Sequence, residues 1–145
     1  MIKAIGLGVV ACFMLVGAAA QAQQVNASQE QLQGQWVSDR VAQGIPMETV
    51  VTITGNTYIS TQSMLSSGVL YSTTQSGEIF VTPPNFLNLA VTDWSPKEYN
   101  GRPMSMPPST FWTILKLTQT QLAVAEPYCL QKSPLQECLV LFNRR

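Results

Sequence analysis

From Gln35 onward, turn residues punctuate the chain at intervals that suit β-strands and leave no room for long helices. Short runs rich in β-branched and aromatic residues alternate with Gly, Asn, Ser and Pro. Gly55-Asn56, between two such runs, signals a two-residue hairpin because both residues tolerate the positive φ of tight turns. The only hint of a 3.6-residue apolar period beyond residue 23 is at Ser28 to Leu32, which is too short to form a stable helix alone. The sequence therefore predicts an all-β protein.

We expect eight or nine short strands. The predicted strands are Gln35–Arg40, Thr49–Thr54, Thr57–Thr61, Val69–Thr74, Glu78–Thr82, Phe86–Trp94, Phe111–Leu117, Leu122–Ala125 and Cys138–Phe142. Ser76-Gly77 is interpreted as a turn between two of these runs. Pro83-Pro84 ends the next run, because proline cannot donate to a strand ladder. This pattern is typical of a small antiparallel barrel or sandwich, and we predict a barrel.

The N-terminus has the pattern of a secretory signal peptide. Lys3 is the only charged residue before Glu30, and an apolar run extends over residues 4–20. Ala20-Gln21-Ala22 offers the small-x-small site of a signal peptidase, so we expect a signal peptide over 1–22. The remaining residues, 23–145, are enough for one domain.

Two alternatives to cleavage are an uncleaved membrane anchor and a lipid attached at Cys12. The membrane anchor fits less well because the apolar run is at the short edge of a membrane span. Lipidation fits less well because the apolar run continues past Cys12. The expected location is the bacterial periplasm or the medium, with no stable membrane span after cleavage.

Removal of the signal peptide leaves Cys129 and Cys138 as the remaining cysteines. A pair of cysteines in an exported protein is most simply a disulfide. Two reduced thiols would be unusual after export. A metal site is disfavoured because no histidine or further cysteine is present to complete it.

The composition argues against an enzyme. The chain has 8 basic and 8 acidic residues and no histidine, so it lacks an imidazole base and the charge that nucleic acid binding requires. Four carboxylates are the acid–base candidates: Asp93, Glu98, Glu126 and Glu137. No pair of them has a spacing that forces proximity. We therefore expect no catalytic residues, no cofactor, no metal and no nucleic acid partner.

Gly34-Gln35-Trp36 at the first strand resembles the Gly-x-Trp signature of lipocalins and related calycin barrels. The resemblance implies that Gly34 allows a tight entry and that Trp36 plugs one end of an antiparallel barrel. It also implies that an arginine from the last strand, Arg144 or else Arg145, packs over the indole, a cation–π contact worth ~0.5–2 kcal/mol. Thr92-Asp93-Trp94 resembles the Thr-Asp-Tyr element of the same family.

Six side chains are candidates for a ligand-binding site. They are Trp94, Met104, Met106, Trp112, Tyr58 and Tyr71. The aromatic residues line a cavity in this hypothesis, although in a small barrel they can equally fill the core. Met104 and Met106 belong to the proline-rich segment 95–109, in which we expect no regular element and which we interpret as a loop over the barrel mouth. Cu(I) held by these thioethers, with Met47 or Met64, is the less favoured alternative.

The function that we expect is that of an exported, non-enzymatic protein that holds a small apolar ligand in its barrel. One alternative is a protein-binding module, such as a protease inhibitor, that uses the polar segment Gln23–Gln33 or the outer loops. Another is a structural component of the envelope, with an envelope protein as its partner. Inward-facing Thr and Ser on residues 49–61 would favour the cavity.

Overall fold

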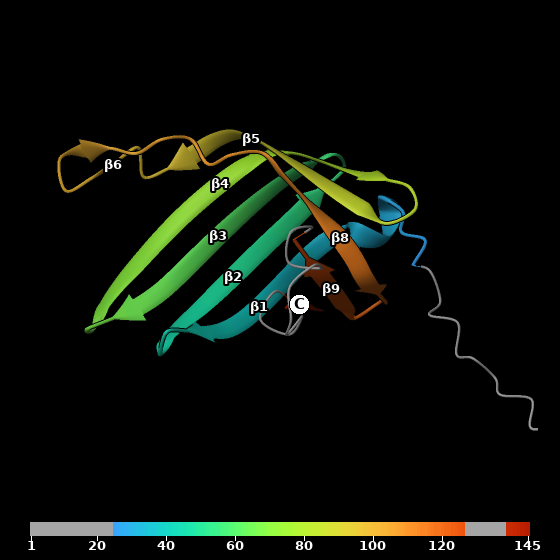
Figure 1. Cartoon of the computed structure of the whole chain (residues 1–145), viewed down its shortest axis with the longest axis horizontal. Helices are drawn as coiled ribbons and strands as arrows, with labels where there is room; N and C mark the ends of the chain where they lie inside the picture. Colours follow the sequence, from blue (N-terminus) through green and yellow to red (C-terminus); the bar gives the residue numbers. More distant parts are fainter. Residues whose placement is uncertain (1–24, 127–138) are drawn as a thin grey trace, which may run out of the picture.

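The computed structural model describes residues 25–126 and 139–145 and confirms the predicted all-β barrel (Figure 1). The barrel strands are β1 (Gly34–Ala42), β2 (Ile45–Thr54), β3 (Thr57–Ser66), β4 (Val69–Thr82), β5 (Phe86–Ser95), β8 (Thr110–Leu117), β9 (Gln121–Ala125) and β10 (Leu139–Arg144). They are antiparallel and close in the order β1-β10-β9-β8-β5-β4-β3-β2. A 3₁₀ turn, η1 (Glu30–Leu32), precedes β1.

Two sequence-based predictions about regular structure are wrong. Ser76-Gly77 is not a turn, because β4 runs through it and the ladder to β5 changes register there. A glycine inside a strand often marks such a bulge. The segment 95–109 does contain regular structure, a hairpin of β6 (Glu98–Tyr99) and β7 (Arg102–Pro103). Its turn residues Asn100 and Gly101 both have positive φ.

The expected signal peptide, the lipidation site at Cys12 and the cysteine pair Cys129 and Cys138 lie outside the described residues. Within the described part of the chain, no helix is long and apolar enough to cross a membrane.

One end of the barrel is closed by Trp36, whose side chain is fully buried. Its indole Nε1 donates to the Leu32 carbonyl at 2.8 Å, and the Arg144 guanidinium carbon lies 4.2 Å from its ring centroid. Arg144 thus occupies the place expected from the sequence. Gly34 adjoins this stack with φ +110°, and a Cβ there would lie 3.0 Å from Arg144 Nη1. Only glycine suits both the backbone angle and the close approach.

The Arg144 guanidinium also joins three chain segments at this end. Its nitrogens donate to the carbonyls of Gln31, Gln33 and Gln119. A planar fork with several donors is required for this arrangement, and lysine lacks it.

We therefore expect Arg144→Lys to lower the free energy of unfolding by about 2 kcal/mol, because hydrogen bonds from a charged group are lost. Arg145→Lys is the matched control. Arg145 lies next in the chain, and its backbone nitrogen donates to the Gln35 carbonyl at 3.0 Å, a hydrogen bond that the substitution keeps. Urea unfolding of both variants measures the difference, and equal stability of the two would contradict the role of Arg144.

The opposite end of the barrel is less completely paired. β5 pairs with β8 only over residues 86–89, although β4 pairs with β5 as far as Ser95. Among the described residues, β1 pairs with β10 only at Trp36 and Val37. The long strands β2, β3 and β4 therefore extend past the short strands β8 and β9, as Figure 1 shows.

Candidate functional site

The barrel interior has a filled half and an open half. Toward Trp36, apolar side chains leave a void of only about 10 Å³. Toward the mouth, a cavity of about 380 Å³ remains. This volume lies within the range of small-molecule sites.

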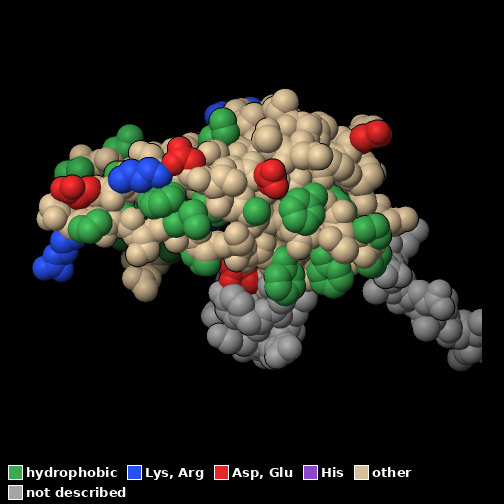
Figure 2. Space-filling model, turned by 90° about the horizontal axis from the view of Figure 1, so that it is seen from above, with side chains coloured by type: hydrophobic (Ala, Val, Ile, Leu, Met, Phe, Trp, Pro, Cys, Tyr) green, Lys and Arg blue, Asp and Glu red, His purple; other side chains and the backbone are tan. Residues whose placement is uncertain are grey.

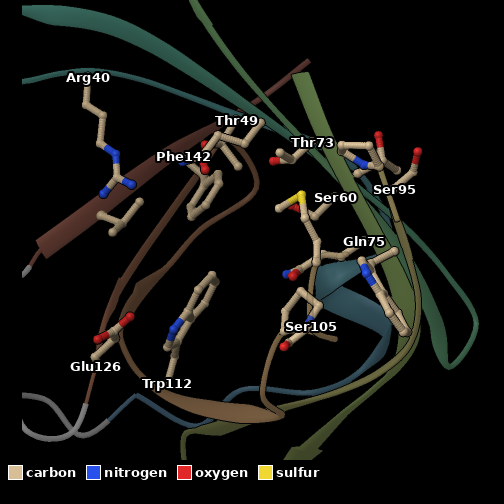
Figure 3. A pocket seen from close by; sticks show the side chains of 17 residues that line it. Arg40, Thr49, Ser60, Thr73, Gln75, Ser95, Ser105, Trp112, Glu126 and Phe142 are labelled. Carbon is tan, nitrogen blue, oxygen red and sulfur yellow. The ribbon is translucent and has the colours of Figure 1, made fainter. Parts of the chain in front are cut away.

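The lining of the cavity mixes aromatic, hydroxyl, amide and charged side chains (Figure 3). The lining residues are Arg40, Thr49, Ser60, Gln62, Thr73, Thr74, Gln75, Trp94, Ser95, Pro96, Met104, Ser105, Pro107, Trp112, Glu126, Val140 and Phe142. Such a lining offers an apolar surface together with many hydrogen-bonding groups, so the cavity is amphipathic.

The aromatic floor of the cavity separates its two halves. Trp112 on β8 and Phe142 on β10 stack with ring centroids 6.3 Å apart and an interplanar angle of 29°. Both rings also line the small void below, so they face the core on one side and the cavity on the other. The floor thus presents flat apolar surface to the cavity.

The register between β2, β3 and β4 determines which polar side chains of these strands line the cavity; we call them the polar wall. Thr49, Gln62 and Thr73 oppose one another across β2, β3 and β4. One row nearer the floor, Ser60 opposes Gln75. Thr49 and Ser60 therefore face inward, the feature that the sequence left undecided and that favours a cavity over a solid core.

Trp94 reaches the cavity because of a β-bulge. Ser76 pairs with Asp93 and Gly77 pairs with Val91, so β5 carries one extra residue, Thr92. In a regular strand Val91 and Trp94 would face opposite sides, yet Val91 is buried and Trp94 lines the cavity. The bulge thus turns the indole inward.

Gly77 makes this bulge possible. A Cβ at this position would lie 1.8 Å from the Ala90 carbonyl oxygen and 3.0 Å from the Thr92 nitrogen. Both are backbone atoms of the facing strand, which cannot yield as a flexible side chain does. The strands therefore approach closely only because residue 77 has no side chain.

Lys97 holds the Trp94 ring in place. Its ammonium nitrogen lies 3.4 Å from the ring centroid and donates to Asp93 Oδ1 at 2.5 Å. The hydrogen bond from Lys97, together with one from the Trp94 backbone, lowers the pKa of Asp93 below its ordinary value. Asp93 is thus an exposed anchor for Lys97.

The segment 95–109 covers the mouth. Pro96, Met104, Ser105 and Pro107 line the cavity, and the Met104 nitrogen donates to the Lys97 carbonyl at 2.8 Å. The β6–β7 hairpin lies beyond this point, where its Tyr99 ring packs against Tyr71 of β4 at 6.4 Å between centroids. Four residues of the segment therefore form part of the cavity lining.

The structure brings three of the six candidate ligand-binding residues to the cavity, namely Trp94, Met104 and Trp112. Tyr58 is buried in the core below the cavity and does not line it. Tyr71 and Met106 also lie outside the lining.

Tyr71 and Met106 lie outside the lining for different reasons. Tyr71 pairs with Met64 near the tip of the β3–β4 hairpin, nearer the mouth than the lining rows. Met106 is half exposed, and unlike Met104 it lies outside the lining.

The sequence-based list of ligand-binding candidates did not include the charged and amide side chains of the lining, although Glu126 was an acid–base candidate. Arg40 and Glu126 lie on one side of the cavity in Figure 3, and Gln75 lies on the other. The alternation Ser60-x-Gln62 and Thr73-x-Gln75 signals two inward polar runs once the facing is known.

The charges near the site are few and of both signs. Figure 2 shows scattered basic and acidic side chains and no extended field of one sign on the face in view. Within residues 25–126 and 139–145, no group of three or more His, Cys, Asp or Glu side chains is placed to hold a metal.

The buried hydroxyl of Tyr58 has no hydrogen-bond partner among the described residues. Burial raises the pKa of Tyr58 above its ordinary value of 10.0. We expect Tyr58→Phe to stabilise the protein by about 1 kcal/mol, because a desolvated hydroxyl is removed without loss of a hydrogen bond. Tyr71→Phe, at a partly exposed ring, should change stability by less than about 0.5 kcal/mol. Thermal unfolding of both variants tests this, and a destabilised Tyr58→Phe would refute it.

Comparison of the chain with models of known protein families, with curated proteins and with solved structures finds no significant match.

Proposed function

We propose that this chain is an exported protein that binds a small amphipathic molecule in the open half of its barrel. The observation that carries the proposal is the cavity of about 380 Å³ with an aromatic floor and a polar wall. The sequence led us to expect an apolar ligand. Gln62, Gln75 and Glu126 line the cavity and are partly buried. They favour a ligand that also carries polar groups, because polar side chains that a ligand covers need hydrogen-bond partners.

The contacts of Gly34, Trp36 and Arg144 support the proposed similarity to lipocalins. In a barrel closed by such a stack at one end, the other end is left as the entrance. The cavity of this protein lies toward that other end, beneath the segment 95–109.

The protein-binding alternative is less favoured because its polar N-terminal segment is already engaged. Gln29 Nε2 donates to the carbonyls of Gly55 and Ile79, and Gln29 Oε1 accepts from the Val81 nitrogen. Gln33 exchanges hydrogen bonds with Gly55. Side chains that bind the barrel in this way are not free to bind a protease.

The test is purification from the native host, followed by extraction and mass spectrometry of any bound compound. Two variants extend it. Ser60→Phe fills the cavity, whereas Ser72→Phe places the same ring at an exposed position of β4. We expect a compound in stoichiometric amount with the wild type and with Ser72→Phe, and its loss from folded Ser60→Phe. A compound retained equally by both variants would contradict binding in the cavity.

A substitution in the segment 95–109 provides a second test of binding in the cavity. Met104→Ser should weaken ligand binding about fivefold or more, because it removes apolar contact at the mouth. Met106→Ser is the matched control, since Met106 lies outside the lining. Titration of both variants with the extracted compound measures the difference. Equal affinities would show that the segment does not contact the ligand.

A further inference from the structure

Two glutamine side chains of the polar wall differ from the other glutamines of the barrel. Among the described residues, five glutamine side chains are hydrogen-bonded to the protein, namely Gln29, Gln31, Gln33, Gln35 and Gln121. Gln62 and Gln75 have no such partner in the described part of the chain, although both are partly buried and line the cavity. A ligand that displaces water from these amides must therefore supply their hydrogen-bond partners.

The amides of Gln62 and Gln75 are within reach of a ligand. Over residues 25–126 and 139–145, the polar side-chain atoms that are buried without a partner belong to Tyr58, Trp94 and Trp112. Those atoms have almost no accessible surface. The two amides are not among them, so their polar atoms keep surface that a ligand in the cavity can contact.

The strand ladder shows that both amides face the cavity. Gln62 lies four residues from Tyr58 on β3, and Gln75 lies four residues from Ile79 on β4. Tyr58 and Ile79 both belong to the core. Residues an even number of positions apart on a strand point to the same side, and the ladder between β3 and β4 has no register shift. Gln62 and Gln75 therefore point inward.

The two amides belong to a cluster of four neutral polar side chains. Gln62 opposes Thr73, and in the next row Ser60 opposes Gln75. The Cβ atoms of opposite residues lie about 5 Å apart, and the two rows are roughly 7 Å apart along the strands. A six-membered ring that carries hydroxyl groups has similar dimensions, so it can contact both rows at once.

This cluster both donates and accepts hydrogen bonds. Each amide has two N–H donors and one carbonyl acceptor, and each hydroxyl donates and accepts. A ligand with acceptors alone would leave the amide oxygens unpaired, and an acyl chain would leave every group unpaired. Ligand hydroxyls match the cluster because they also work in both senses. Arg40 and Glu126 lie on the other side of the cavity (Figure 3), so the cluster has no charge with which to neutralise an ion.

We infer that the ligand is a glycoside, with its sugar hydroxyls against the polar wall and its apolar aglycone over the stack of Trp112 and Phe142. This inference rests on the proposed function and narrows its ligand class. The aglycone accounts for the apolar part of the lining, which a free sugar would leave in contact with water.

The test uses probes that differ in their hydroxyl groups. Three are the phenyl β-glycosides of xylose, glucose and galactose. The fourth is 2-phenoxytetrahydropyran, which has the skeleton of the xyloside without its hydroxyls. Isothermal titration calorimetry of the wild type measures the four affinities. We expect at least one glycoside to bind about tenfold or more tightly than the ether, because two or more hydrogen bonds are gained.

Two variants locate those hydrogen bonds. Gln62→Leu and Gln75→Leu should each lower the affinity for the best glycoside about fivefold and should not weaken binding of the ether. Gln119→Leu is the matched control. Gln119 is exposed and lies between β8 and β9 at the closed end, where its carbonyl accepts from Arg144, so this substitution should alter neither affinity.

The outcomes separate this inference from the proposed function. If the ether binds as tightly as every glycoside, the sugar assignment is overturned while a binding cavity remains. The wild-type titrations decide this point even if a variant folds poorly. If none of the four probes binds at millimolar concentration, the glycoside inference is also overturned, and the compound extracted from protein of the native host then tests the proposed function by itself.

Discussion

Trp36→Ala should lower the free energy of unfolding by about 3–5 kcal/mol, a loss typical of large aromatic truncations in cores. The fully buried indole plugs the closed end, and its removal leaves a cavity that the surrounding strands cannot fill. It also removes the hydrogen bond to Leu32 and the surface beneath the Arg144 guanidinium. Urea unfolding followed by circular dichroism measures the loss.

Trp94→Ala is the matched control, because Trp94 is only partly buried and lines the open half. We expect a clearly smaller loss of stability and a larger loss of ligand affinity than for Trp36→Ala in conditions where both are folded. The opposite order would mean that Trp94 belongs to the core and Trp36 to the site.

Gly77→Ala should destabilise the barrel by about 3 kcal/mol or more, at the upper end of overpacking effects. The new Cβ would lie 1.8 Å from the Ala90 carbonyl oxygen, so β4 and β5 must separate at the bulge. Because this bulge turns Trp94 inward, ligand affinity should fall as well. Urea unfolding and titration with the extracted compound measure the two effects.

Gly68→Ala is the control for Gly77→Ala, because it strains the backbone without bringing the new Cβ close to other atoms. Gly68 has φ +75° in the β3–β4 turn, and a Cβ there meets nothing within 4 Å. This substitution should cost only about 1–2 kcal/mol, from the left-handed backbone alone, and leave binding intact. Similar losses for both variants would show that the close approach at Gly77 relaxes without cost.

The strands were predictable from the sequence because their signals are local, as at Gly55-Asn56, which marks its hairpin by backbone preference. The contact of Arg144 with Trp36 joins distant parts of the chain and was expected from the resemblance to lipocalins. The β6–β7 hairpin had a local signal too, Asn100-Gly101. The surrounding prolines concealed it, since they exclude longer strands but not a two-residue ladder.

The polarity of the site was not predictable, because it depends on which side each strand residue faces. A single inserted residue at Thr92 reverses that side for Trp94, and the sequence around Gly77 reads equally well as a turn or as a bulge. The height of a side chain along the barrel is likewise set by register across strands. Tyr58 and Tyr71 were therefore placed in the site on residue type alone, and register puts one below it and one above.

The most direct test of the account is a crystal structure of the protein purified from its own host. We predict a small amphipathic compound above the stack of Trp112 and Phe142, in contact with Trp94 and Met104 and hydrogen-bonded to polar side chains of the lining. A barrel whose upper half is filled by its own side chains, with no cavity for a ligand, would contradict the central claim.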